Sequence, residues 1–428
     1  MSRFTRGIFA VAFLLVVATL FVALLSSIIS AVDLGSDQKG KARIRKRVKD
    51  AAAENFPLKS GLVDLNGGVC RAVGRRLCNE NILCRNGVTV KSYWNPPVDD
   101  KVDGCRYVRE LSAFCKDYGI SFLFVAAPAK IDNAMQMYPD GWNSCGNFNS
   151  WAHACCEKFK REGIDVVDLT SKYTADPEMV RRNFFKSDHH WRVPTAFDAA
   201  RTVVGRLSVM LSDANVTDHP FIDPEKWQWY VLKECYVGSH GGRTGRFFTG
   251  VDDFEYAVPK FKTQMSKTFF RNSIVRSGSF EDTIIEKSGI KRGGYTGRYR
   301  IFGGGDDEWQ SLQHTLKDQR MLTVNEGAPC DKRIFISRDS FGIPFAAVLS
   351  VLFKEVYICD PRDLPPSLGE RDVIKEYRPD VVVRICYPPS LKVMPRGWTA
   401  GEKREKQKNI RVAPCCSHQL NSFFSFCR

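Results

Sequence analysis

The sequence predicts an α/β protein built around a doubly wound parallel sheet. Short apolar runs without charge, typical of strands buried on both faces, alternate with segments whose apolar residues recur at helical spacing. Such alternation is characteristic of a parallel sheet covered by helices on both faces. The length of 428 residues and the hydrophobic content of 43% agree with one sizeable globular domain.

Each predicted element depends on its own pattern. A helix over 105–116 is indicated by Val108, Leu111 and Phe114, which share one helical face, and a strand over 120–127 by a dense run of Phe, Leu and Val. The same criteria predict, in chain order, a helix over 151–159, a strand over 164–169, a helix over 194–211, a strand around 334–336, a helix from 344 to about 353, a strand over 356–359, a helix near 372–377 and a strand over 381–385.

Residues 212–330 depart from this pattern and are rich in Gly, Arg, Lys and aromatic residues, which predicts an irregular insertion. Aromatic faces stack on sugar rings and Arg side chains pair with carboxylates, so Trp229, Arg243 and Arg246 are candidate glycan contacts. For each of these side chains a purely structural role is the competing interpretation.

The uncharged residues 8–32 are long enough, at about 1.5 Å per residue, to cross a hydrocarbon core of about 30 Å as a helix. A cleaved signal peptide is the alternative, although its apolar region would be shorter. We therefore divide the chain into a membrane anchor (1–32), a basic linker (33–60), a catalytic domain (61–392) and a basic, cysteine-bearing tail (393–428).

The orientation of the anchor is indicated by two conflicting patterns. By charge alone, the basic linker that follows the anchor would keep the rest of the chain in the cytoplasm. All fifteen cysteines follow the anchor, which favours disulfide use in an oxidising compartment, so we predict that the catalytic domain is extracytoplasmic. The net charge of +15 favours anionic surroundings such as acidic glycans, wall polymers or lipid head groups. No recognisable nucleic-acid-binding motif accompanies it, so no nucleic-acid partner is predicted.

Two short clusters supply the parts of a serine catalytic site. The first is Ser187-Asp188-His189-His190-Trp191, and the second is Ser337-Arg338-Asp339-Ser340-Phe341-Gly342. A serine hydroxyl is a poor nucleophile unless an imidazole takes its proton, and a third group must orient that imidazole. In an extended segment Asp188 and His190 would share one side, with His189 on the other, so we predict His190 as the base and keep His189 as the alternative. Trp191 would wall the site, where it is a candidate substrate contact, or anchor the turn.

Ser340 follows a buried strand and precedes a buried helix. Gly342 and Pro344 suit the tight turn and the first helical turn between them. This geometry would aim free backbone N–H groups of the helix start at a reacting carbonyl. Asp188 and the adjacent histidines could instead bind zinc, but no second His pair and no CxxC motif accompanies them, so neither metal nor cofactor is expected.

Together these residues resemble the DHHW proteins, which are similar to the alginate O-acetyltransferases with an SGNH-hydrolase-like fold. The resemblance covers roughly residues 75–392 and includes the motifs 188–191 and 339–342. It also includes the segments 124–130, 238–245, 252–254 and 378–383. It implies a triad of Asp188, His190 and Ser340. It further implies transfer of an acetyl group to a hydroxyl of an exported polysaccharide, usually alongside a multispanning membrane acyltransferase.

We therefore expect a membrane-anchored, extracytoplasmic O-acetyltransferase that works through a Ser340 acyl-enzyme and acts on an exported or cell-surface polysaccharide. A polysaccharide acetyl esterase would use the same side chains, because only the exclusion of water separates the two outcomes. A non-catalytic glycan-binding or assembly protein that retains the fold is the third possibility.

Overall fold

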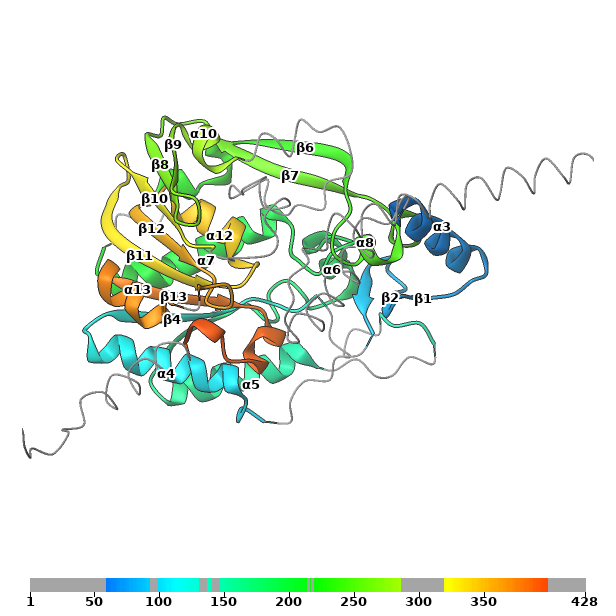
Figure 1. Ribbon diagram of the computed structural model, residues 1–428, viewed down its shortest axis with the longest axis horizontal. Helices are drawn as coiled ribbons and strands as arrows, with labels where there is room; N and C mark the ends of the chain where they lie inside the picture. The colour runs from blue at the N-terminus through cyan, green and yellow to red at the C-terminus, as the bar shows by residue number, and fades with distance from the viewer. Residues whose placement is uncertain are drawn as a thin grey trace, which may run out of the picture.

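The computed structural model describes residues 59–92, 99–130, 137–140, 147–213, 216, 219–285, 319–365 and 367–398. These residues form a large central sheet with helices on both of its faces (Figure 1). The predicted anchor over residues 8–32 lies outside the described residues. Within the described residues, no helix is both long and apolar enough to cross a membrane.

The central sheet has eight strands and is mixed rather than wholly parallel. Five strands run parallel in the order β5 (Asp165–Asp168), β4 (Ser121–Ala126), β13 (Val381–Cys386), β11 (Cys330–Arg338) and β12 (Phe353–Cys359). Three further strands continue the sheet antiparallel beyond β12, in the order β10 (Met321–Asn325), β8 (Met265–Phe269) and β9 (Ile274–Gly278). The prediction of a parallel sheet is confirmed for the first five strands only.

Two hydrophobic cores lie on opposite faces of the sheet. Leu123 and Val125 of β4 join the core formed with α7 (Val193–Leu211) and α12 (Gly342–Leu349). Phe122 and Phe124 join the other core, formed with α4 (Asp103–Asp117), α5 (Phe148–Arg161) and α13 (Glu370–Tyr377). Because side chains alternate along a strand and both faces are covered, the buried parts of the central strands are mainly apolar, although β11 and β13 also bury Arg338 and Arg384.

Smaller elements surround the sheet. Helix α3 (Lys59–Ala72) precedes a three-stranded antiparallel sheet, and β6 pairs with β7 in a separate antiparallel ribbon. The remaining elements are β1 (Leu77–Cys78), β2 (Asn81–Leu83), β3 (Thr89–Lys91), α6 (Pro177–Asn183), β6 (Trp227–Tyr236), α8 (Gly241–Thr244), α9 (Arg246–Thr249), β7 (Asp252–Pro259) and α10 (Phe280–Ile284).

The interpretation of residues 212–330 as an irregular insertion is wrong in the part that the structure describes. This stretch supplies β6 and β7 and three strands of the central sheet. In β8 and β10 buried and partly exposed residues alternate, which is the pattern of a strand covered mainly on one face, and the abundance of Gly and Arg around them obscured it.

The helix predicted from 344 to about 353 ends at Leu349, and β12 begins at Phe353. A continuous apolar run is compatible with either a buried helix or a buried strand, so its internal boundary was not predictable from spacing. Beyond residue 392 the fold continues to Trp398, which is fully buried and donates its indole N–H to Glu110 at 2.5 Å.

Candidate active site

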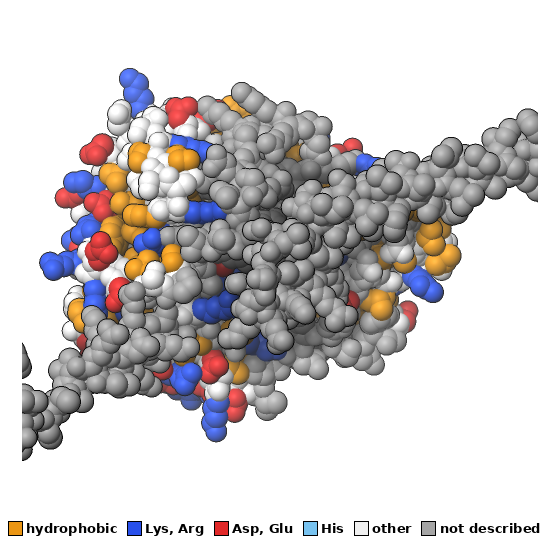
Figure 2. Space-filling model, viewed as in Figure 1, with side chains coloured by type: hydrophobic (Ala, Val, Ile, Leu, Met, Phe, Trp, Pro, Cys, Tyr) orange, Lys and Arg blue, Asp and Glu red, His pale blue; other side chains and the backbone are white. Residues whose placement is uncertain are grey.

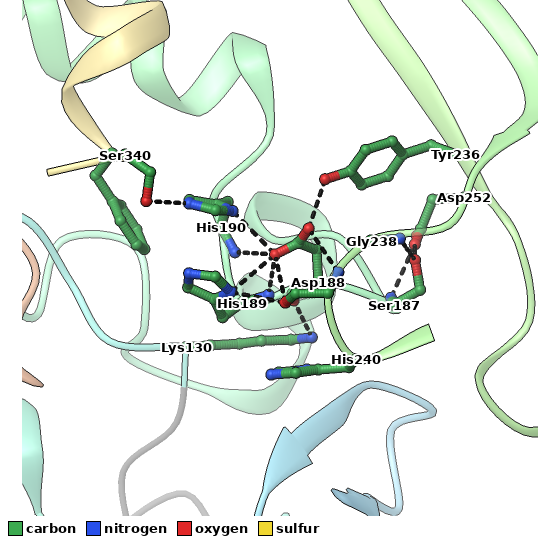
Figure 3. Close-up of polar contacts among 12 residues, drawn as sticks. Lys130, Ser187, Asp188, His189, His190, Tyr236, Gly238, His240, Asp252 and Ser340 are labelled. Carbon is green, nitrogen blue, oxygen red and sulfur yellow. Dashed lines mark hydrogen bonds and ion pairs between the residues drawn. The ribbon is translucent and has the colours of Figure 1, made fainter. Parts of the chain in front are cut away.

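The two predicted motifs meet at the carboxyl-terminal edge of the parallel strands. Ser340 lies in the turn between β11 and α12, and Asp188 to His190 lie in the loop that precedes α7. Helices α7 and α12 pack against each other on the same face of the sheet, which brings the two turns together (Figure 3). This is the edge at which open α/β sheets generally bind ligands.

Ser340, His190 and Asp188 form a continuous hydrogen-bonded chain. The distance from Ser340 Oγ to His190 Nε2 is 2.6 Å, and that from His190 Nδ1 to Asp188 Oδ1 is 2.9 Å (Figure 3). His190 and Asp188 are buried, whereas Ser340 is half-buried. With its Nδ1 proton directed at the carboxylate, the neutral ring accepts the Ser340 hydroxyl proton on Nε2, as nucleophilic activation requires.

The Asp188 carboxylate is held by donors from the end of β6 and the segment that follows it. Its Oδ2 accepts the Tyr236 hydroxyl at 2.5 Å and the Ser239 backbone N–H at 3.0 Å. Burial alone would raise the pKa of Asp188, but the charges and hydrogen bonds of His190 and His189 outweigh it and hold this pKa well below its usual value. Asp188 is therefore ionised at neutral pH.

His189 does not point away from Asp188, contrary to the prediction. Its Nδ1 lies 3.0 Å from Asp188 Oδ1 and 2.9 Å from Ser239 Oγ. Residues 186–190 form bends rather than extended chain, and the backbone N–H groups of both His189 and His190 donate to Asp188 Oδ1. The chain therefore curls around the carboxylate, and the alternation of an extended strand does not apply. His190 is the ring that reaches Ser340.

The turn at Ser340 uses most of its amides internally. The N–H of Phe341 donates to Asp339 Oδ1 at 2.9 Å, that of Gly342 to the Asp339 carbonyl and that of Ile343 to the Ser340 carbonyl. The prediction of several free amides is therefore wrong. Among the hydrogen bonds of the described ranges none uses the Ser340 amide, which makes it the turn's candidate donor to an oxyanion.

Asp339 has a positioning role that the sequence did not suggest. Its Oδ2 accepts the Tyr387 backbone N–H at 2.9 Å and the Ser390 hydroxyl at 2.8 Å. The carboxylate thus ties the turn that carries Ser340 to the chain leaving the neighbouring strand β13.

Trp191 packs behind the site and does not line it. Its side chain is fully buried, and its ring lies 5.3 Å from that of Phe341, which in turn lies 5.0 Å from the His190 ring. Of the two predicted roles, contact with substrate is thus excluded in this conformation and anchoring of the turn is supported. Aromatic contacts of this kind lock the two motifs to each other.

The three other predicted binding residues lie outside the triad. Trp229 packs on Phe197 of α7 and donates its indole N–H to the Pro224 carbonyl, and it precedes Tyr236 by seven positions along β6. Arg246 forms an ion pair with Asp64 of α3 at 2.9 Å. Arg243 is exposed on α8. The structure therefore gives Trp229 and Arg246 structural contacts, and it does not bring either to Ser340.

Two buried charged residues hold the loop that carries Asp188. Lys130 donates through Nζ to the backbone carbonyls of Thr89, Lys186 and Asp188 at 2.8 to 3.0 Å. Asp252 accepts the Ser187 hydroxyl at 2.6 Å and its backbone N–H at 2.8 Å. Burial lowers the pKa of Lys130 to about 8, against the opposing charges of Asp252 and Asp188. A lysine four positions after the end of a buried strand was the available signal, but the groups to which it donates could not be predicted from spacing.

Asp188, His189 and His190 could also converge on a metal ion, because their ligand atoms lie within 4.8 Å of one another. Each of these atoms already takes part in the hydrogen bonds described above. The expectation that no metal is needed stays a prediction.

Gly238 leaves space that Asp188 fills, since a Cβ there would overlap the Asp188 carboxylate. We expect Gly238→Ala to displace this carboxylate and to lower kcat/KM by about 100-fold, because misplacing a catalytic group by about 1 Å can cost that much. Gly242→Ala is the matched control, since no atom lies within 4 Å of its added Cβ. Equal rates for the two variants, measured with an acetyl-ester substrate, would contradict the role of Gly238.

The pH dependence of the reaction follows from His190. Burial, and after it the neighbouring His189, lowers the pKa of His190 below 6.5. The ring must be neutral to accept a proton, so activity is present above this pKa and lost as the pH falls through it. We expect the acid limb of a kcat/KM profile to have its midpoint below pH 6.5. His153→Gln, which alters an exposed histidine, should leave the profile unchanged, and a midpoint above 6.5 would rule out this assignment.

Comparisons with known proteins identify one family model and several solved structures that resemble this chain. Residues 101–221 match a family model described as the SGNH hydrolase-like domain of the acetyltransferase AlgX. The structure of Bacillus cereus PatB1 aligns at a TM-score of 0.53 and 16% identity, over 71% of this chain and 94% of that one. No curated protein matches the sequence.

Two further solved structures share the fold. A DHHW family protein from Eubacterium siraeum aligns at a TM-score of 0.52 and 16% identity, over 77% of this chain and 96% of that one. The structure of Bacillus cereus PatB1 with a sulfonyl adduct aligns at a TM-score of 0.53 and 15% identity, over 72% of this chain and 93% of that one. The chain thus has a mixed α/β, SGNH-hydrolase-like fold, and its predicted resemblance to DHHW proteins and AlgX-type acetyltransferases is confirmed.

Proposed function

We propose that this protein is a serine-dependent O-acetyltransferase that passes acetyl groups to hydroxyls of an exported or cell-surface polysaccharide. The observation that carries the proposal is the 2.6 Å contact between Ser340 Oγ and His190 Nε2, with Asp188 behind the imidazole. The match of residues 101–221 to an acetyltransferase domain supports acetyl as the transferred group. The polysaccharide acceptor rests on the resemblance to alginate O-acetyltransferases and on the net charge of +15.

The reaction proceeds in two half-reactions. His190 takes the hydroxyl proton as Ser340 attacks the acetyl carbonyl, and it returns the proton to the leaving group of the donor. In the second half His190 accepts the proton of a sugar hydroxyl, which attacks the acetyl-Ser340 ester. The Ser340 oxygen leaves with the proton held by His190. The Ser340 amide stabilises the oxyanion in each half-reaction, and Asp188 stabilises the imidazolium.

An acetyl esterase is the second candidate, because water can take the place of the sugar hydroxyl at the same triad. Ser340 is only partly buried, in line with access of either acceptor to this residue. The two activities are distinguished by product: acetylated oligosaccharide for the transferase and free acetate for the esterase. A glycan-binding protein without activity would yield neither product.

The proposal is tested by trapping the acyl-enzyme. The purified full-length protein is incubated with a chromogenic acetyl ester, quenched in acid and digested, and the peptide carrying Ser340 is analysed by mass spectrometry. We expect an added acetyl group on Ser340 that disappears when acceptor oligosaccharide is supplied. PatB1 has been obtained with a sulfonyl adduct, so a sulfonyl fluoride should block the same residue. Turnover without modification of Ser340 would refute the proposal.

We further propose that residues 8–32 anchor the protein in a membrane and that the catalytic domain lies outside the cytoplasm, with the acetyl group supplied by a multispanning membrane acyltransferase. The uncharged composition of residues 8–32 supports the anchor.

The cysteines provide a test of the compartment in which the catalytic domain lies. The eleven described cysteines carry no disulfide in this structure, yet Cys105 Sγ and Cys155 Sγ lie only 3.7 Å apart between α4 and α5.

We expect Cys105 and Cys155 to be joined in protein recovered from its own cells. Exchange with a disulfide-bearing thiol oxidoreductase would form the S–S bond while two protons and two electrons reduce that enzyme. Alkylation followed by peptide mapping should show the crosslinked pair, whereas Cys115 should be alkylated as a free thiol. Complete alkylation of Cys105 and Cys155 would place the domain in a reducing compartment.

A further inference from the structure

Helix α3 presents an apolar stripe to the solvent. The stripe consists of Leu62, Leu65, Val69 and Val73, which are 47%, 61%, 53% and 64% exposed. Their spacings of three, four and four residues place them on one face of a helix, and the Val73 N–H continues the helical hydrogen bonding to the Val69 carbonyl. A helix that packs on a domain normally buries such a face, so this one is turned the opposite way.

The rotation of α3 is fixed by its other face. Gly67 lies so close to α8 that a Cβ would overlap the Thr244 carbonyl oxygen. Asp64 accepts the Arg246 backbone N–H at 2.8 Å and pairs with its guanidinium at 2.9 Å. Cys70 is buried on the same face. These contacts hold the small and polar residues against the domain and leave the apolar stripe exposed.

Exposed aromatic and basic side chains lie on and next to α3. Phe247 of α9 is 57% exposed and lies next to α3, since a Cβ on Gly68 would contact it at 3.5 Å. Arg71, Arg75, Arg76 and Arg243 are all exposed close to the helix. Asp64, the one acidic residue of α3, is already paired. Figure 2 shows hydrophobic side chains beside a basic one at the end of the molecule where Figure 1 labels α3.

We propose that the stripe and its arginines form a membrane-docking surface, which lies flat in the interface of a bilayer that contains anionic lipids. An exposed apolar helix face with arginines nearby is a composition that binds such interfaces, because apolar side chains enter the acyl boundary while cations meet anionic head groups. The position of α3 in the chain also favours a membrane as the partner of this surface, since α3 follows the uncharged residues 8–32 and a basic linker.

This surface would set the orientation of the catalytic domain relative to the membrane. The chain passes directly from Ser239, whose N–H binds Asp188, through α8 to Arg243 and then Arg246, which fastens α3. The segment that holds the triad carboxylate of Asp188 therefore continues directly into the docking surface. The proposal does not depend on acetyl transfer, because an inactive domain would dock in the same way.

The test uses the full-length chain in vesicles, with a photoreactive amino acid in place of Leu65. After illumination, mass spectrometry should detect lipid adducts in vesicles that contain 30% phosphatidylglycerol, at about tenfold higher yield than in pure phosphatidylcholine. The same amino acid in place of Val275, which is 60% exposed on β9, should give no adduct. Equal yields in both vesicles, adducts with a second copy of the chain, or the absence of adducts would overturn the proposal.

A charged variant separates docking from folding and catalysis. Leu65→Glu combined with Val69→Glu should reduce the lipid adducts formed from a photoreactive residue at position 62 by about tenfold. Both side chains are exposed, so hydrolysis of a soluble acetyl ester should be unchanged. Unchanged adduct formation would refute docking through this stripe, whereas loss of ester hydrolysis alone would bear on the proposed function and not on the surface.

Discussion

Ser340→Ala is expected to lower kcat/KM for acetyl transfer by roughly 10⁴- to 10⁶-fold, the range seen when the nucleophile of a serine triad is removed. The reason is that His190 Nε2, 2.6 Å from Ser340 Oγ, would have no hydroxyl to activate, and no acetyl-enzyme could form. Transfer is measured as acetylated oligosaccharide produced from a chromogenic acetyl donor. In the variant, the peptide that carries position 340 should also remain unacetylated.

The control for this substitution is Ser277→Ala. Ser277 is exposed on β9, at the antiparallel edge of the sheet, so its loss should leave both rate and folding unchanged. Circular dichroism and thermal unfolding of the Ser340 variant should match the parent, because the hydroxyl is half-buried and makes one contact in the described chain. A fully folded Ser340→Ala protein with activity near that of the parent would exclude a serine mechanism.

Asp188→Asn is expected to reduce kcat/KM by about 10³- to 10⁴-fold, as loss of the triad carboxylate does in other serine enzymes. The amide would face the His190 Nδ1 proton, the Tyr236 hydroxyl and the Ser239 N–H, all of which donate to the carboxylate. One of these donors would lose its acceptor, and the wrong tautomer of His190 would be favoured. The imidazolium formed during the reaction would also lose its counter-charge.

A kinetic comparison distinguishes this role from a general effect of charge. Asp331→Asn removes a carboxylate that is 81% exposed and paired with Lys354, so its kcat/KM should equal that of the parent. The Asp188 variant should lose kcat far more than it raises KM, because Asp188 does not face the acceptor. A large increase in KM at constant kcat would instead assign Asp188 to substrate binding.

The triad could be predicted from the sequence because its chemistry is concentrated in two short motifs, and both turns follow elements with strong apolar patterns. Ser340 follows the buried β11, and Asp188 and His190 precede the regular helix α7. The donors to Asp188 could not be derived in this way. Tyr236 and Ser239 come from a segment nearly fifty residues later, and their approach depends on how the β6–β7 ribbon crosses the sheet edge.

The binding residues illustrate a different limit. Trp229, Arg243 and Arg246 were selected because aromatic and cationic side chains suit glycans, but the same side chains suit packing and ion pairs equally well. The Asp64 partner of Arg246 lies 182 residues earlier in the chain, and no local pattern reveals it. In the same way, the direction of the His189 side chain depends on a bend in which two backbone N–H groups donate to Asp188 Oδ1. The alternation of side chains along an extended strand does not predict such a bend.

One stretch of chain supplies both the strands β8 and β9 and the residues that hold the triad loop, which are Tyr236, Ser239 and Asp252. This double role constrains any re-engineering of the protein. A cassette exchange over residues 219–285 would have to restore the pairing of β8 with β10 while reproducing every donor to one carboxylate. Chimeras with relatives are therefore a poor route to new acceptor preference. Single replacements at exposed positions such as Ser277 on β9 leave both tasks intact.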